Sequence, residues 1–187
     1  MAVVFYVILA VVVLIPLILV ILYNGLVRSR NMVEEGWSGI DVQLTRRADL
    51  VPNLVETVKG YAAHEKSVLE EITAARTAAT SARSVDGTRE AANQMTAALG
   101  HLFAVAEAYP DLKADANFRE LQTQLAETED MIQKARRYYN GAVRRLNTGV
   151  EQFPGNMVAR QFGFERAEYF EIEDPASRTL PKVDFGG

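Results

Sequence analysis

The residues that could carry acid–base or metal chemistry are few, and their spacing does not match the metal sites that helices carry. Histidine occurs only at His64 and His101, and cysteine does not occur. A zinc-protease helix would need a second histidine four residues after His64, where the chain has Val68. The carboxylate-rich di-iron site of helical bundles needs a Glu-x-x-His pair, which the sequence lacks. We therefore expect no catalytic residue, no metal and no other cofactor, and we interpret His64 and Glu65 as a polar pair on a helix face.

Other chemistries find equally little support. The glycines form neither a phosphate-binding loop nor a dinucleotide fingerprint, and no serine-nucleophile signature occurs. The lack of cysteine excludes disulfides and thiolate catalysis. The net charge is −4, with acidic and basic residues interspersed and no sustained basic stripe, so we expect no nucleic-acid partner.

The dominant feature of the chain is its apolar N-terminal segment. From Ala2 to Leu22 no charged or strongly polar side chain occurs. A helix of this length spans about 30 Å, the thickness of the hydrocarbon core of a bilayer, so the segment is predicted to cross a membrane. A signal peptide would need a basic region before the segment and small residues after it, and neither is present. Pro16 removes one helical hydrogen bond, but neighbouring groups in lipid can satisfy the freed carbonyl. It therefore predicts a mild kink and not a break.

Residues after this segment predict its orientation and its contact with lipid. Arg28 and Arg30 follow the span closely, and no Lys or Arg precedes it, so the folded part is predicted to face the cytoplasm. Tyr23 is the expected aromatic residue at the membrane interface. Arg28 and Arg30 are expected either to contact anionic headgroups or to serve topology alone.

Helical periodicity continues beyond the span. Apolar residues recur at steps of three, four and seven from Leu26 to Val51, so the membrane helix is expected to run on into the soluble part. Pro52 disfavours the α conformation of Val51 and predicts a boundary or a kink. A second periodic run follows and ends at the turn-forming residues 81–87.

Two further helices are predicted after this turn. Thr88 is expected to cap the third helix and Pro110 to end it. Asp111 or Asp115 is expected to cap the fourth. The fourth run, residues 118–149, keeps a heptad repeat, which predicts knobs-into-holes packing against neighbouring helices.

These runs predict an all-α fold. An N-terminal transmembrane helix, residues 1–25, runs into a long antiparallel bundle of three to four helices, residues 26–155. An irregular, aromatic-rich tail follows at residues 156–187. We expect the tail to dock on the bundle or on a neighbouring subunit, because its aromatic side chains would be unfavourable in water. The docking residues are Phe162, Phe164, Tyr169 and Phe170.

One set of apolar and aromatic positions is expected to mediate helix packing or self-association, because it follows the helical repeats. Gly36 and Gly39 flank Trp37, and we favour close backbone packing there. The set consists of Trp37, Ile40, Leu44, Leu54, Val58, Tyr61, Phe118, Leu121, Leu125, Ile132, Tyr139 and Leu146.

Beyond these patterns, specific motifs make the chain resemble the LemA family along almost its whole length. They are Tyr23-Asn24-Gly25-Leu26-Val27, Arg30-Asn31, Trp37-Ser38, Ile40-Asp41-Val42-Gln43-Leu44, Arg46-Arg47, residues 49–61, His64-Glu65, residues 106–114, Asn117-Phe118, Leu121-Gln122, Thr128-Glu129, Ala135-Arg136-Arg137, Tyr139-Asn140, Phe153-Pro154, Phe162-Gly163-Phe164 and Tyr169-Phe170-Glu171. A minor departure is Leu146-Asn147, where the family commonly has a second Tyr-Asn pair. The resemblance implies a bacterial single-span membrane protein with a helical bundle, no accepted catalytic residues and a role in membrane organisation.

The resulting functional hypothesis is a non-enzymatic, membrane-anchored helical scaffold in the bacterial inner membrane that self-associates and organises or remodels that membrane. Its expected partners are membrane lipids and further copies of the chain. The alternative is an adaptor or regulatory subunit that presents its bundle to another membrane protein, such as a protease or a signalling complex. A third interpretation, an enzyme of unrecognised type, would need a cleft with convergent polar groups.

Overall fold

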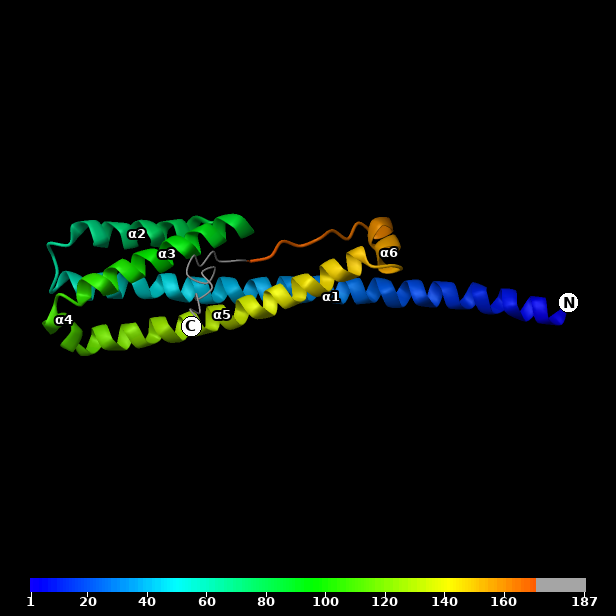
Figure 1. Cartoon of the computed structure of the whole chain (residues 1–187), viewed down its shortest axis with the longest axis horizontal. Coiled ribbons are helices and arrows are strands. Elements are labelled where there is room, and N and C mark those ends of the chain that lie inside the picture. The colour runs from blue at the N-terminus through cyan, green and yellow to red at the C-terminus, as the bar shows by residue number, and fades with distance from the viewer. Residues whose placement is uncertain (171–187) are drawn as a thin grey trace, which may run out of the picture. The chain divides into compact units, whose positions relative to one another are not determined.

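The protein is all-α, as predicted. The computed structural model describes residues 1–170, in which no strand occurs, and the predicted tail beyond Phe170 lies outside the described residues (Figure 1). The helices are α1 (Ala2–Lys59), α2 (Lys66–Ser81), α3 (Val85–Ala106), α4 (Pro110–Ala114), α5 (Ala116–Glu151) and α6 (Gly155–Phe162).

Helix α1 joins the apolar segment to the folded part without interruption. It passes through Pro52 and ends at Lys59, so the boundary considered at Pro52 is absent. The lack of an N–H on Pro52 leaves the carbonyl of Ala48 without its helical donor. The Nε of Arg76 on α2 donates to that carbonyl at 3.1 Å. A side chain from another helix thus supplies the missing hydrogen bond, which no local pattern could indicate.

The other helix boundaries differ from the prediction in instructive ways. Ser84, not Thr88, caps α3, and its hydroxyl accepts from the backbone N–H of Gly87 at 3.0 Å. Helix α3 ends at Ala106, and Pro110 begins α4, because proline fits the first turn of a helix. Asp115 caps α5 as considered, since its Oδ1 accepts from the N–H of Phe118 at 2.9 Å.

Helix α6 corrects the prediction of an irregular tail from Asn156. Gly155–Phe162 is helical, and its buried residues are Gly155, Val158 and Ala159. An eight-residue helix is too short for periodicity to reveal, and short helices depend on tertiary burial for their stability. Within the described part of the predicted tail, residues 164–170 lack regular secondary structure.

The chain divides into two compact units, and helices α1 and α5 contribute to both. The first unit consists of residues 1–47 and 124–169. In it, α5 lies alongside α1 in antiparallel orientation, because Gly36 approaches Tyr139 while Arg47 pairs with Glu129. The second unit contains residues 48–123 and Phe170. The predicted domain limits at residues 25 and 155 stay predictions.

Antiparallel helix pairing also organises the second unit. Helices α2 and α3 pack side by side (Figure 1). Near the start of α2, Glu65 accepts from the hydroxyl of Tyr109 at 2.8 Å. Further along, Glu71 contacts Nδ1 of His101 at 3.0 Å. The core of this unit includes the fully buried Leu54, Ile72, Leu102 and Leu112.

Candidate membrane interface

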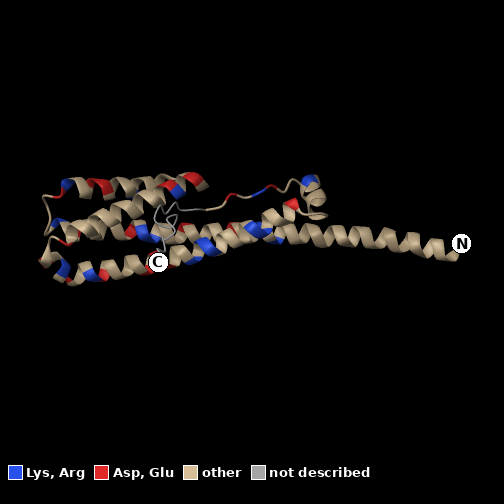
Figure 2. Ribbon diagram, in the orientation of Figure 1, with Lys and Arg blue, Asp and Glu red and all other residues tan. Residues whose placement is uncertain are grey.

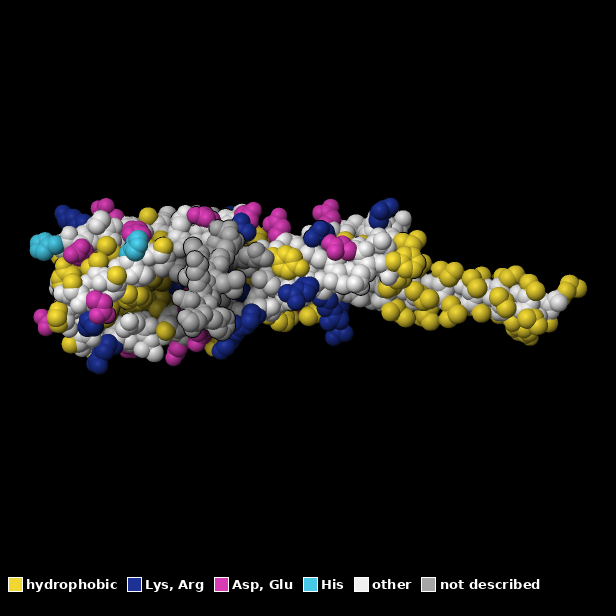
Figure 3. All heavy atoms as spheres, viewed as in Figure 1, with side chains coloured by type: hydrophobic (Ala, Val, Ile, Leu, Met, Phe, Trp, Pro, Cys, Tyr) yellow, Lys and Arg dark blue, Asp and Glu magenta, His cyan; other side chains and the backbone are white. Residues whose placement is uncertain are grey.

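The N-terminal part of α1 has the length and composition of a membrane span. None of its most apolar window is buried inside the structure. No charged residue precedes Arg28, as Figure 2 shows. The apolar side chains form a continuous surface along this part of the helix (Figure 3). Water solvates such a surface unfavourably, which makes this part of α1 a candidate membrane span.

A small hydrophobic core within the first unit begins where the apolar segment ends. Leu22, the last residue of that segment, packs against it with its side chain partly buried. Its buried members come from α1, α5, α6 and the chain after α6. They are Leu26, Leu146, Val158, Ala159 and Phe164. This core therefore holds α6 against the first turns of α1 that follow the predicted span.

Two glycines permit this arrangement. A Cβ on Gly155 would overlap the carbonyl oxygen of Gly149, so only glycine allows α6 to begin this close to the end of α5. Gly163 has φ 68° and ψ 33°, the left-handed conformation that glycine adopts without steric cost. The chain reverses there and brings Phe164 back to α1.

Aromatic side chains from the predicted tail surround the predicted interface residue Tyr23. The ring of Phe162 lies 4.9 Å from that of Tyr23, and the ring of Phe164 lies 5.7 Å from it, both edge-on. The guanidinium of Arg30 lies 5.5 Å from the centre of the Phe164 ring, a cation–π geometry. Phe162 and Phe164 thus dock on their own chain, beside the end of the predicted span.

Polar contacts fix the chain that follows. The buried amide of Asn147 donates to the carbonyl of Ala167 at 3.0 Å and accepts from its N–H at 2.8 Å. The Tyr139 hydroxyl donates to the carbonyl of Glu168 at 2.8 Å. Burial raises the pKa of Tyr139, so this hydroxyl keeps its proton as a donor. Tyr169 is half-buried and Phe170 fully buried.

A polar hollow lies next to this cluster in the first unit. It has a volume of about 510 Å³ and lies between α1 and α5. Exposed Arg28 supplies its positive charge, and Tyr138 donates to Glu35 at 3.1 Å on its wall. This hydrogen bond raises the pKa of Tyr138. The lining residues are Asn24, Val27, Arg28, Asn31, Met32, Glu35 and Tyr138.

Most of the positions predicted to pack between helices are filled by intramolecular packing. Trp37 is half-buried, with its ring centre 5.7 Å from that of Tyr139. Tyr61 lies in the turn after α1, is 43% exposed and donates to Asp115 at 3.0 Å. The buried positions are Ile40, Leu44, Leu54, Val58, Phe118, Leu121, Leu125, Ile132, Tyr139 and Leu146.

A charged network is also built into the first unit. The Nη1 of Arg47, a buried side chain, donates to Oε2 of Glu129 at 2.9 Å. Burial lowers the pKa of Arg47, and the adjacent Glu129 carboxylate opposes that shift. The other oxygen of Glu129 accepts from Gln133, whose amide oxygen accepts from Arg136. The network links α1 to α5, which is a structural role.

The described residues show no metal-binding cluster of His, Asp and Glu. Glu65 bonds Tyr109, and His101 pairs with Glu71 in the second unit. Sequence reasoning missed Asn147, Gly155 and Gly163. Of these, Gly163 had a visible signal, since a glycine between two phenylalanines suggests a tight turn that places both rings.

An all-α fold that has, among its described residues, one helix long and apolar enough to cross a membrane defines the class of this protein. The sequence model of the LemA family matches residues 36–185. The chain belongs to the LemA family.

Similar proteins extend this assignment. Magnetosome protein MamQ 2 of Paramagnetospirillum magneticum is 30% identical, and the match covers 84% of this chain and 67% of the relative. Magnetosome protein MamQ of Magnetospirillum gryphiswaldense is 26% identical with the same coverage. Protein LemA of Metamycoplasma hominis is 28% identical over 153 residues, 81% of this chain and 69% of the relative.

Proposed function

We propose that this protein is a membrane-anchored, self-associating helical scaffold that organises or remodels the bacterial inner membrane, with its folded part in the cytoplasm. The observation that carries the proposal is the fully exposed apolar part of α1, which continues as one helix into the folded chain. Each Val, Leu, Ile or Phe side chain gains about 1.5–3 kcal/mol on leaving water, so the segment supports stable anchoring. The relatives' names denote magnetosome proteins and LemA, and none denotes an enzyme.

Self-association would use outer surfaces, because the heptad positions already pack within one chain. Val42 on α1 is 57% exposed and Met131 on α5 is 45% exposed, and both belong to the first unit. Confinement to a membrane raises the effective concentration of anchored copies, so several weak contacts can sustain an assembly.

Native mass spectrometry and cross-linking of the full-length protein in detergent and in lipid nanodiscs test the scaffold. We expect oligomers that a Val42→Ser, Met131→Ser double variant shifts toward monomer. Glu127→Ser, an exposed polar position on the same helix as Met131, is the matched control and should leave the distribution unchanged. Detection of monomer alone under all conditions would remove self-association from the proposal.

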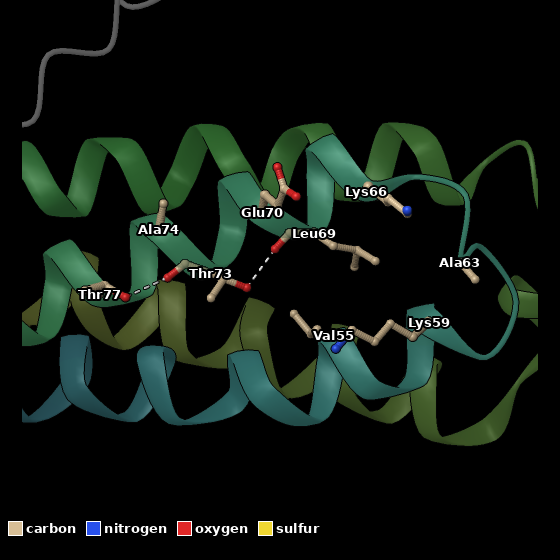
Figure 4. A pocket seen from close by; sticks show the side chains of 9 residues that line it. All are labelled: Val55, Lys59, Ala63, Lys66, Leu69, Glu70, Thr73, Ala74 and Thr77. Atoms are coloured by element: carbon tan, nitrogen blue, oxygen red, sulfur yellow. Dashed lines mark hydrogen bonds between the residues drawn. The ribbon is translucent and has the colours of Figure 1, made fainter.

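A groove in the second unit favours the alternative, an adaptor that presents its helices to another membrane protein. The groove lies between the end of α1 and α2 and has a volume of about 680 Å³ (Figure 4). Val55 and Leu69 form apolar walls, and Lys59 and Lys66 lie at its rim (Figure 4). The remaining lining residues are Ala63, Glu70, Thr73, Ala74 and Thr77.

A Thr73→Trp variant distinguishes the two functions, because Thr73 lies on the side of α2 that faces Val55 (Figure 4) and the introduced indole would occupy the groove. An adaptor would lose a stoichiometric foreign protein in pull-downs while its own oligomers stayed unchanged. A scaffold would yield homogeneous self-assemblies without a foreign component. Ala97→Trp on the exposed surface of α3 controls for the added aromatic ring.

A further inference from the structure

Three large apolar side chains remain exposed around α6. Phe153, in the turn before the helix, is 79% exposed, Met157 is 63% exposed and Phe162 is 58% exposed. The inner face of the same helix is fully used, since Val158 and Ala159 are buried in the core of the first unit. Phe153 and Met157 are therefore exposed apolar side chains that intramolecular packing does not need, and Phe162 leaves more than half of its surface exposed although its ring contacts Tyr23.

The position of this surface points to its partner. Phe162 contacts Tyr23, which directly follows the last residue of the apolar segment, and the core beneath α6 includes Leu22 and Leu26. At 1.5 Å per residue, Leu22 to Leu26 occupies about 6 Å of helix axis. Helix α6 is thus attached to α1 about one turn beyond the end of the apolar segment. In Figure 3, apolar atoms at this end of the folded part adjoin those of the span.

The side-chain distribution on α6 suits a water–lipid boundary. With 3.6 residues per turn, Met157 falls on the outer side of α6 between Arg160 and Gln161, whereas Phe162, the last residue of the helix, falls on the side of Val158 and Ala159, toward α1. A basic side chain next to exposed apolar ones suits the interfacial layer of a membrane, where the charge contacts headgroups and the apolar side chains reach the acyl boundary. Aromatic rings are also favoured at that depth.

We propose that the turn at Phe153 and helix α6 form a second membrane contact, inserted into the interfacial layer of the bilayer that α1 crosses. Phe153, Met157 and Phe162 would contact lipid, and Arg160 would lie among headgroup phosphates. The inference rests on the anchoring step of the proposed function and is independent of self-association. A bilayer is favoured over a second copy of the chain because the surface is continuous with the span.

Such a contact has a mechanical consequence. A single span leaves the first unit free to rotate about the helix axis, whereas a second contact beside the span restricts its orientation. The inserted side chains also occupy area in only one leaflet. Helix α6 is therefore the element through which a scaffold of anchored chains could act on the membrane.

The lack of cysteine in the chain allows a direct test, because a single introduced cysteine carries a spin label at one defined site. Full-length Phe153→Cys and Met157→Cys variants are labelled and reconstituted into phosphatidylethanolamine–phosphatidylglycerol vesicles. Power saturation then measures accessibility to oxygen, which concentrates in lipid, and to a water-soluble nickel chelate. Glu127→Cys, exposed in the same unit, is the aqueous control, and Val13→Cys is the control within the span.

We expect labels at 153 and 157 to resemble the span control, with an oxygen-to-nickel ratio at least severalfold above that at 127. Nickel accessibility equal to that at 127 would overturn the inference. If both reagents are excluded, and dilution of the protein in lipid restores their access, the surface contacts a second copy of the chain. That result would also overturn the inference. Water-like accessibility at 13 would show instead that the anchoring itself is wrong.

Discussion

Gly36 allows α5 to approach α1 at the level of the backbone. A Cβ at this position would lie 3.0 Å from Cα of Tyr139 and 3.1 Å from Cδ1 of Tyr138. The added methyl group must push the two helices apart, so we expect Gly36→Ala to lower the free energy of unfolding by about 1–3 kcal/mol. Denaturant unfolding of the full-length protein in detergent, followed by circular dichroism, measures this change.

Gly39 provides the matched control, and it also corrects part of the packing expectation. No neighbouring atom lies within 4 Å of the position that its Cβ would occupy, so the close packing expected beside Trp37 holds for Gly36 alone. Because alanine restricts the unfolded chain more than glycine does, Gly39→Ala should stabilise the protein by about 0.5–1 kcal/mol. Equal effects of the two substitutions would contradict the proposed role of Gly36.

Arg76 and Pro52 are expected to affect the free energy of unfolding in a coupled way. The carbonyl of Ala48 is buried and receives its hydrogen bond from Arg76 in place of residue 52. Arg76→Met should therefore destabilise the protein by about 1–3 kcal/mol, the cost of an unsatisfied buried acceptor. In a Pro52→Ala background, the N–H of residue 52 can donate to Ala48, and the same substitution should cost much less. A double-mutant cycle by denaturant unfolding measures this coupling, and additive effects would refute it.

Asp115 predicts a defined pH dependence. The backbone N–H of Phe118 and the hydroxyl of Tyr61 hold its pKa below the ordinary value of 3.8. Since the unfolded chain binds this proton more readily, the stabilisation is present above pH 3.8 and is lost as pH falls through the lowered pKa. Asp115→Asn keeps an acceptor for the cap but removes the charge.

We expect the thermal midpoint of Asp115→Asn to lie below that of the native protein at pH 7, and the difference to shrink below pH 3.8. Thermal scans between about pH 2.5 and 7, in steps of about half a pH unit, resolve this trend. Asp130→Asn removes an exposed carboxylate from the interior of α5 and should show no such trend. A difference for Asp115→Asn that does not change with pH would show that its charge contributes nothing.

At the scale of whole elements, the strongest periodic pattern gave the most accurate prediction. The heptad run predicted a helix over residues 118–149, and α5 spans Ala116–Glu151. Pro52 shows where local rules fail, because Arg76 supplies from another helix the hydrogen bond that proline removes. Helix α6 was missed for a related reason. Its stability depends on burying Val158 and Ala159 against distant residues, which a short sequence window cannot show.

The segment after α6 is held mainly through Asn147, which was not among the predicted docking residues. Its amide makes both backbone hydrogen bonds of Ala167. Asn147→Leu keeps the side-chain volume but removes both, at about 1 kcal/mol each. We expect hydrogen exchange at the Ala167 amide and tryptic cleavage after Arg166 to accelerate about tenfold or more.

The same Asn→Leu substitution at an exposed asparagine controls for the added apolar side chain. Asn156→Leu on α6 should leave exchange at Ala167 unchanged, because Asn156 is exposed. Unaltered protection of Ala167 in Asn147→Leu would mean that the ring contacts of Phe164 alone hold this segment.

For the whole molecule, the span and its family could be inferred from sequence, whereas the arrangement beside the span could not. An unbroken apolar stretch is a local property of the sequence, so recognising it does not depend on tertiary contacts. The return of Phe162 and Phe164 to Tyr23 joins residues far apart in the chain, and it depends on Gly155 and Gly163 together. The sequence suggested that the aromatic residues dock, but only the structure identifies α1 as their partner.

The orientation of the whole chain in the membrane is the last prediction. Arg28 and Arg30 follow the span and no basic residue precedes it, so the folded part should remain in the cytoplasm. Single cysteines at Ala2 and at exposed Arg83, in the turn between α2 and α3, report the two sides. In intact spheroplasts, a membrane-impermeant maleimide should label position 2 and reach position 83 only after lysis. Labelling of position 83 before lysis would show the opposite orientation. Helix α6 would then contact the other leaflet.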